Sequence, residues 1–217
     1  MQEIWWMRFG RQVFKMIKNL YLIRHGQSMQ NKVANCFSGS TDVSISEKGR
    51  QQAAELAGFF RDITIDEIYT SKLVRAIQTA KIIFGEERPL IQVEALREAD
   101  FGEYEGRTFE KGDPDPVYQA WLHAADTLTF PGGDNMCERM EEYYEAVQNL
   151  MRETKAENVA IVSHRTSIRL FTAKVMGLPI QNFRNIPCDN CSVMKFRFDK
   201  ETGGFALEYC NYRQGVR

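Results

Sequence analysis

The pattern of apolar and polar positions predicts strands that alternate with helices along the chain. An unbroken apolar run at residues 20–23 is typical of a buried parallel strand, and a second such run lies at residues 159–162. Each run leads into a polar segment that contains a histidine, His25 after the first and His164 after the second. Shorter strands are predicted near residues 68–69 and 91–93, and a terminal hairpin from residues 193–198 and 205–209 around Gly203-Gly204.

Four segments have the spacing of amphipathic helices, the last of them after His164 with Ile168, Phe171 and Val175 on its apolar side. The first follows Ser46, a suitable N-cap, and the second follows Ser71, which we expect to cap a helix with Arg75 in its first turns. The third is a long helix over residues 136–151, with methionine and tyrosine on its apolar face. Residues 97–134 show the weakest periodicity, so we expect an excursion over the active site there.

Alternating strands and helices predict an α/β fold, a three-layer sandwich with a mostly parallel central sheet. Ligands of open α/β sheets bind beyond the carboxyl ends of the strands, where both His25 and His164 are placed. The chain has only three histidines, and the third, His123, has no such setting. Two histidines at strand ends therefore indicate a functional site.

Composition limits the domain organisation and the classes of partner. A chain of 217 residues with 43% hydrophobic residues can bury one core, so we expect a single domain over residues 17–217 after an extension at residues 1–16. The 28 basic and 29 acidic residues provide no excess positive charge for nucleic acid or an anionic membrane. No apolar run approaches the roughly 20 residues of a membrane span.

Cysteine usage and the start of the chain favour a cytoplasmic protein. Charged residues interrupt residues 1–16 too often for a signal-peptide core, although a helix that binds a membrane surface or a partner is an alternative for this extension. Five cysteines, an odd number, indicate free thiols in a reducing compartment. Cys188 and Cys191 form a C-x-x-C without the second pair of a zinc site, so we expect ordinary buried thiols.

The residues at the strand ends provide groups that phosphoryl transfer requires. Arginine grips phosphate oxygens with forked hydrogen bonds, and Arg24 and Arg75 provide two such groups. A neutral imidazole is a competent nucleophile, and nearby guanidinium charge keeps it unprotonated, which suits His25. A further donor stabilises the charge on the equatorial oxygens of the transition state, and His164 is the candidate for it.

Separated blocks of the chain follow one another in the order of a known family. They are Leu20 to Ser28, Asn31, Asp42 to Gly49, Ser71 to Ala80, Leu96 to Glu98, Phe101 to Gly106, Pro131 to Gly133 and Ser163-His164. Together these blocks resemble the histidine phosphatase superfamily, which includes the cofactor-dependent phosphoglycerate mutases. The resemblance covers nearly all of the chain from Leu20 onward and implies the phosphoglycerate mutase-like sandwich. It also implies Glu98 as the acid that protonates the leaving group and activates water, and Asn31 as a phosphate-binding residue.

Each assignment has a structural alternative. A capped strand end would explain residues 24–25, a solvated surface charge would explain Arg75, and a turn residue would explain Asn31. The alternative for Glu98 is that it belongs to a solvated acidic loop without a catalytic role. The competing carboxylates are Asp100, Glu103 and Glu105.

Two positions depart from the family pattern. The residue after the second histidine is usually small in the family, but here it is Arg165. Its side chain either points into the pocket, where it would contact a substrate phosphate or carboxylate, or points away. Ser38 stands where many relatives have a larger polar residue, and the interval from Asn31 to Gly39 is one residue longer than expected. Ser38 and Arg165 are therefore candidate substrate-binding residues.

The sequence thus predicts a metal-independent phosphomonoesterase, without a cofactor, that hydrolyses a small phosphate ester through a phosphohistidine on His25. A cofactor-dependent phosphoglycerate mutase is one alternative, which the short excursion between Gly106 and Gly133 disfavours because mutases usually carry a longer insertion. A phosphate-binding protein without turnover is another. A homodimer is compatible with the sequence, and the physiological substrate is left open.

Overall fold

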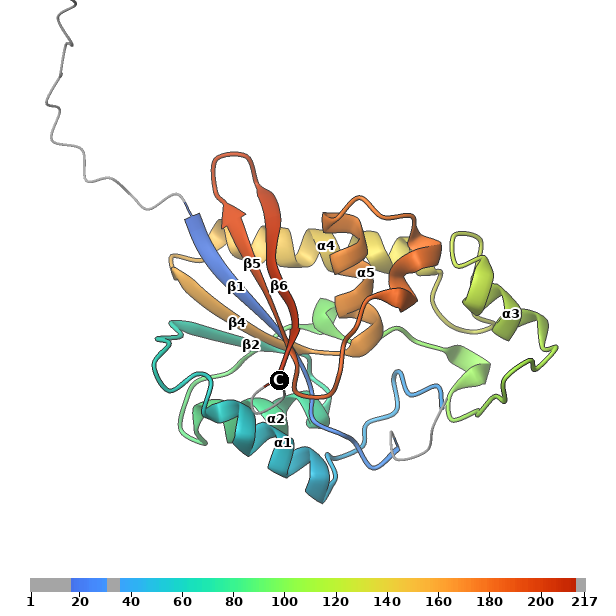
Figure 1. Cartoon of the computed structure of the whole chain (residues 1–217), viewed down its shortest axis with the longest axis horizontal. Helices are drawn as coiled ribbons and strands as arrows, with labels where there is room; N and C mark the ends of the chain where they lie inside the picture. Colours follow the sequence, from blue (N-terminus) through green and yellow to red (C-terminus); the bar gives the residue numbers. More distant parts are fainter. Residues whose placement is uncertain (1–16, 31–35, 214–217) are drawn as a thin grey trace, which may run out of the picture.

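The computed structural model describes residues 17–30 and 36–213, and it confirms the three-layer α/β prediction. In this part of the chain one six-stranded sheet has the order β3-β2-β4-β1-β5-β6 (Figure 1). Strands β1 to β4 run parallel, whereas β5 and β6 are antiparallel to their neighbours. The strands, from β1 to β6, are Ile17–Arg24, Glu67–Thr70, Ile91–Gln92, Asn158–Ser163, Val193–Asp199 and Gly204–Tyr212.

Strands β1 and β4 lie side by side at the centre of the sheet. Their parallel register pairs Arg24, the last residue of β1, with Ser163, the last residue of β4. The residues that follow these two are His25 and His164, and both are buried. Two histidines that are far apart in the sequence therefore lie close together at the carboxyl end of the sheet.

Helices cover both faces of the sheet, α1 and α2 on one face and α4 and α5 on the other (Figure 1). Successive side chains of β1 alternate between the two layers, because side chains point to opposite faces of a strand. Tyr21 and Ile23 pack with α1 and α2, whereas Leu20 and Leu22 pack with α4 and α5. The α-helices, from α1 to α5, are Glu47–Ala57, Val74–Phe84, Pro116–His123, Met136–Glu153 and Arg165–Val175.

Of the two serines predicted to cap helices, Ser46 does so and Ser71 does not. The prediction for Ser46 is confirmed, because its hydroxyl oxygen accepts a hydrogen bond from the amide of Gly49 at 3.1 Å. The prediction for Ser71 is wrong: the cap position of α2 is Leu73, and Ser71 lies directly after β2. The Ser71 hydroxyl instead accepts from the amide of Leu73, within the turn that joins β2 to α2.

Residues 97–134 contribute more to the core than their weak periodicity suggests. They contain α3 and a cluster of edge-to-face aromatic rings, which contacts Phe37 from the segment after β1. Both ends of the excursion meet at Gly102, where a Cβ atom would lie 2.1 Å from the carbonyl oxygen of Pro131. The buried aromatic residues of this region are Phe101, Tyr104, Phe109, Trp121 and Phe130.

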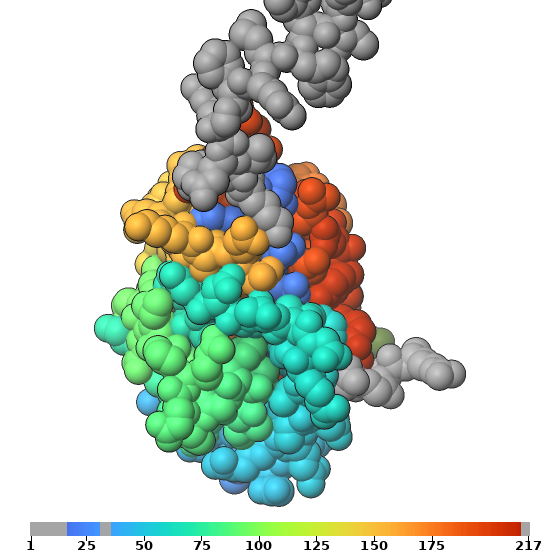
Figure 2. All heavy atoms as spheres, turned by 90° about the vertical axis from the view of Figure 1, so that its left-hand side faces the viewer, coloured from blue at the N-terminus to red at the C-terminus, as the bar shows by residue number. Residues whose placement is uncertain are grey.

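The opposite end of the sheet, where the parallel strands begin, is closed by hydrogen bonds. Figure 2 shows the turn before β2 (teal) against the segment before β4 (orange). Asp66 accepts hydrogen bonds there from the amides of Glu157 and Asn158, at 3.1 and 2.8 Å. The predicted extension, residues 1–16, lies outside the described residues. None of the helices that the structure describes has the length and apolar character to span a bilayer.

Candidate active site

The loop after β1 is fixed by contacts from two directions. On one side it touches the start of α1 so closely that a Cβ atom on Gly26 would lie 2.5 Å from the carbonyl oxygen of Gly49. On the other side the Asn190 side chain donates to the carbonyl oxygen of His25 at 2.9 Å, and the Cys191 amide donates to that of Arg24 at 3.0 Å. These contacts hold the His25 backbone rigidly at the strand end.

The structure brings the rings of His25 and His164 to a centroid distance of 5.2 Å, as expected from the paired strand ends. Nδ1 of the His25 ring lies 2.7 Å from the carbonyl oxygen of Gly26. A carbonyl oxygen only accepts, so Nδ1 carries the proton of the neutral ring. The lone pair of His25 is therefore on Nε2, as a nucleophile requires.

His164 has the opposite tautomer. Its Nδ1 lies 3.2 Å from Nε of Arg75, which only donates, so Nδ1 carries the lone pair and Nε2 carries the proton. Within residues 17–30 and 36–213 this buried Nε2 has no hydrogen-bond partner. A donor without a partner beside the His25 ring is suited to a substrate oxygen, because a buried donor left unpaired is costly.

Burial and positive charge keep both rings neutral. Burial, followed by the charges of Arg75 and Arg24, holds the pKa of His25 well below its ordinary value of 6.5. Burial and Arg75 lower the pKa of His164 in the same direction. The two imidazoles are therefore unprotonated at neutral pH, one able to attack phosphorus and the other able to donate a hydrogen bond.

The two arginines are held by backbone carbonyl groups. Nη1 of Arg24 donates to the carbonyl oxygen of Cys188 at 2.7 Å, and burial lowers the pKa of Arg24 to about 10, so it remains charged at neutral pH. Arg75 is fully buried, and its two terminal nitrogens donate to the carbonyl oxygens of Gly39 and Thr41 at 2.6 and 2.7 Å. With the bond to His164, these contacts occupy three of its five N–H groups, which leaves two for an oxyanion.

The side chain of Glu98 lies against the start of α5, the helix that begins directly after His164. Its carboxylate accepts from the amides of Thr166 and Ser167, each at 3.0 Å, and from the Ser167 hydroxyl at 3.2 Å. The first-turn amides of a helix have no partner within the helix, so they are free to bind this side chain. These bonds fix the orientation of Glu98 while it lines the same cavity as His25.

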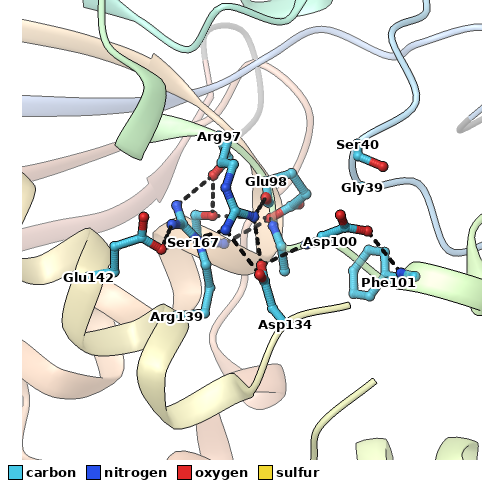
Figure 3. Close-up of polar contacts among 12 residues, drawn as sticks. Gly39, Ser40, Arg97, Glu98, Asp100, Phe101, Asp134, Arg139, Glu142 and Ser167 are labelled. Atoms are coloured by element: carbon cyan, nitrogen blue, oxygen red, sulfur yellow. Dashed lines mark hydrogen bonds and ion pairs between the residues drawn. The ribbon is translucent and has the colours of Figure 1, made fainter. Parts of the chain in front are cut away.

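The segment that carries Glu98 is tied to α4 by a network of charged side chains (Figure 3). Arg97 forms a two-pronged ion pair with Asp134, at 2.6 and 2.9 Å, and Asp134 also accepts from the amide of Asp100 at 2.8 Å. The buried Arg139 donates to the carbonyl oxygen of Arg97 at 2.9 Å. The carboxylate of the competing Asp100 has another partner, since it accepts from the amide of Gly102 at 2.8 Å.

A cavity of about 120 Å³ opens beside the two strand ends. Of the predicted residues, Arg24, His25, Ser38, Glu98 and Arg165 line it. Ser38 donates its hydroxyl to the side-chain oxygen of Gln30 at 2.9 Å. Asn31 lies outside the described residues, so its assignment stays a prediction. No group of three or more His, Cys, Asp or Glu side chains in the described residues is placed to hold a metal ion.

The family is decided by the sequence as a whole. A model of the histidine phosphatase superfamily, branch 1, matches residues 20–211. The chain belongs to the histidine phosphatase superfamily.

Relatives in this superfamily have both phosphatase and mutase names. A Hydrogenobacter thermophilus protein provisionally named phosphoserine phosphatase 2 is 32% identical over 91% of this chain and 99% of its own length. A 2,3-bisphosphoglycerate-dependent phosphoglycerate mutase of Cytophaga hutchinsonii is 35% identical over 69% of this chain and 73% of its own. The crystal structure of a phosphoserine phosphatase mutant of Entamoeba histolytica, in complex with phosphoserine, is 26% identical, with a TM-score of 0.82 over 92% of this chain and 100% of that one.

Sequence reasoning missed several residues of the histidine phosphatase cavity. Arg169 follows Arg165 by one turn of α5, a spacing that could have indicated a shared face. Arg184 lies in a short 3-10 helix, Ile180–Asn185, for which the sequence gave no signal. The remaining lining residues that were not predicted are Cys36, Phe37, Phe101, Tyr118, Trp121 and Thr166.

Proposed function

We propose that this histidine phosphatase is a metal-independent phosphomonoesterase that hydrolyses a small phosphate ester through a phosphohistidine on His25. The observation that carries the proposal is the pair of complementary tautomers in one buried site. Nε2 of His25 has the lone pair of a nucleophile, and Nε2 of His164 has a proton to donate. Relatives named as phosphatases support hydrolysis, and the phosphoserine complex supports a small phosphate ester.

In the first step, Nε2 of His25 attacks phosphorus as the bond between phosphorus and the ester oxygen breaks. Glu98, in its protonated form, gives its proton to the leaving alkoxide. Arg24, Arg75 and the N–H of His164 stabilise the negative charge on the equatorial oxygens.

In the second step, a water molecule loses a proton to Glu98 and attacks the phosphohistidine. The phosphorus–nitrogen bond breaks, inorganic phosphate leaves, and His25 regains its lone pair. Asn31 is proposed to assist in holding the phosphate. A cytoplasmic location and a homodimer stay predictions.

A phosphoglycerate mutase is the second candidate, because the Cytophaga relative with that name is 35% identical. A mutase would return the phosphoryl group from His25 to an acceptor instead of releasing it to water. The two candidates share their first step and differ in the second.

Hydrolysis of p-nitrophenyl phosphate with excess EDTA tests the proposal. We expect turnover to be unaffected by the chelator, to vanish in His25→Ala, and to fall by roughly 10²- to 10³-fold in His164→Ala, as for loss of one transition-state donor. Conversion of 3-phosphoglycerate to 2-phosphoglycerate with a bisphosphoglycerate primer, without release of phosphate, would establish the mutase instead. Binding of phosphate without either reaction would rule out both.

A further inference from the structure

Three guanidinium groups line the cavity without a role in the chemistry described above. Arg165 and Arg169 come from α5, and Arg184 comes from the short 3-10 helix at 180–185. Together with Arg24 they put four arginines around one small cavity that also holds His25. One phosphate already has Arg24 and Arg75, so the other three are available to a different part of the substrate.

These three arginines lack carboxylate partners in the described part of the chain. No ion pair within 4.0 Å involves Arg165, Arg169 or Arg184 there, and the buried Nε of Arg169 has no hydrogen-bond partner. Other arginines of the chain do have such partners. Arg97 pairs with Asp134, Arg139 with Glu142, and Arg197 with Glu208.

The cavity itself offers little compensating negative charge. Among the described residues that line it, Glu98 is the one carboxylate, and its oxygens accept from the amides at the start of α5. Burial and the charge of Arg165 lower the pKa of both Arg169 and Arg184. Such a cluster of like charges is destabilising unless an anion joins it.

We propose that Arg165, Arg169 and Arg184 form a subsite for a second anionic group of the substrate, a carboxylate or a second phosphate. This inference rests on the proposed function, since it places the phosphate ester itself at His25. Planar guanidinium groups bind such anions with paired hydrogen bonds, and the missing charge partners of the cluster are then supplied by the substrate.

The size and the walls of the cavity limit the substrate further. A volume of about 120 Å³ lies well below the roughly 300–1,000 Å³ of sites for drug-sized ligands. The second anion must therefore lie only a few bonds from the phosphate ester. Arg184 also lies over the ring of Trp121, 5.7 Å from its centroid, which fixes one wall of the subsite.

Matched substrates that differ in one charge test the subsite. 3-Phosphoglycerate and glycerol 3-phosphate have the same carbon skeleton and differ in a carboxylate against a hydroxymethyl group. We expect kcat/KM of the wild-type protein to be at least about tenfold higher for 3-phosphoglycerate, the value of one charge-assisted hydrogen bond. Glycerol 1,3-bisphosphate against glycerol 3-phosphate is the corresponding pair for a second phosphate, and it distinguishes the two sources of negative charge.

Arginine variants connect the preference to these residues. In Arg165→Gln and Arg184→Gln the ratio of kcat/KM for 3-phosphoglycerate over glycerol 3-phosphate should fall at least about fivefold, mainly through a higher KM for 3-phosphoglycerate. Arg61→Gln removes the same charge at an exposed position outside the cavity and serves as the matched control. The comparison within each variant cancels any loss of folded protein.

The experiments distinguish a failure of the subsite inference from a failure of the proposed function. If wild-type protein hydrolyses both members of each pair with equal kcat/KM, or if the arginine variants leave the ratio unchanged, the subsite is overturned while the phosphatase proposal stands. If no phosphate ester is hydrolysed in a His25-dependent manner, the proposed function fails. The ratio between substrates is then undefined, and the subsite inference fails with it.

Discussion

At the scale of single residues, identical side chains have different chemistry because their partners differ. His25 is next to a carbonyl oxygen and His164 is next to a guanidinium group, so the first has its proton on Nδ1 and the second on Nε2. The sequence located both histidines but could not assign the tautomer of His164, since its partner comes from α2, 89 residues away in the chain.

The lowered pKa values of the two histidines predict how stability depends on pH. In the unfolded chain each imidazole takes up a proton near pH 6.5, whereas in the folded protein each stays neutral to a much lower pH. Below about pH 6.5 the unfolded state therefore binds more protons, and the free energy of unfolding falls as pH falls. For each histidine the slope approaches about 1.4 kcal/mol per pH unit once the pH is well below 6.5.

Urea unfolding at several pH values between 7 and 5 measures this slope. Near pH 5, His25→Ala and His164→Ala should each reduce this slope by about 1.4 kcal/mol per pH unit, because each removes one group that is neutral only when folded. His123→Ala, at an exposed position on α3, is the matched control. Equal slopes in the wild-type protein and in both site variants would show that the imidazoles are not held neutral.

At the scale of elements, the position of Glu98 depends on the contacts that its loop, which follows β3, makes with the starts of α4 and α5. Glu98 is at the start of α5, while Arg97 beside it is bound to Asp134, just before α4. The sequence predicted α4 closely, because its apolar stripe is long. The ion pair could not be predicted, since its two residues are 37 positions apart and lie in loops without periodicity.

Asp134→Asn tests whether this ion pair positions Glu98. The amide keeps the shape but loses the charge, so Arg97 loses its two-pronged partner and the segment of Glu98 gains freedom. We expect kcat for p-nitrophenyl phosphate to fall about tenfold with little change in KM, since a misplaced acid affects the chemical step rather than binding. Unfolding by urea should show a loss of about 1–2 kcal/mol.

A matched control for this variant removes an ion pair elsewhere on α4. Glu141→Gln breaks the exposed ion pair between Glu141 and Lys174, which is separate from the pair of Arg97 with Asp134. Its kcat should equal that of the wild-type protein. If Asp134→Asn lost stability but kept full kcat, the ion pair would be structural only.

At the scale of the whole molecule, the fold follows from features that the sequence displays directly. The apolar runs at 20–23 and 159–162 became the two central strands, and the hairpin around Gly203-Gly204 became β5 and β6. The prediction failed where tertiary packing overrides local pattern. Trp121, for example, is buried among other aromatic rings in a helix that the weak periodicity of residues 97–134 did not reveal.

The residues of the site also divide into those that the local sequence pattern reveals and those that only tertiary packing brings there. Residues that directly follow a central strand were found from the sequence, because parallel strands end at a common edge. Glu98 and Ser38, which enter the cavity from loops, were predicted only through the resemblance to the family. Arg184 was not found, because no strand or long helix leads to it. The sequence therefore predicts the reacting groups better than the groups that select the substrate.

The central claim, transfer of the phosphoryl group to His25, is tested most directly by trapping the phosphorylated protein. Wild-type protein mixed with labelled phosphate ester and quenched in alkali within one turnover should carry label on His25, stable in alkali and released by acid, and His25→Ala should carry none. Label that survives acid, label that alkali releases as expected for an acyl phosphate on Glu98, or turnover with no labelled protein at any quench time would contradict the account.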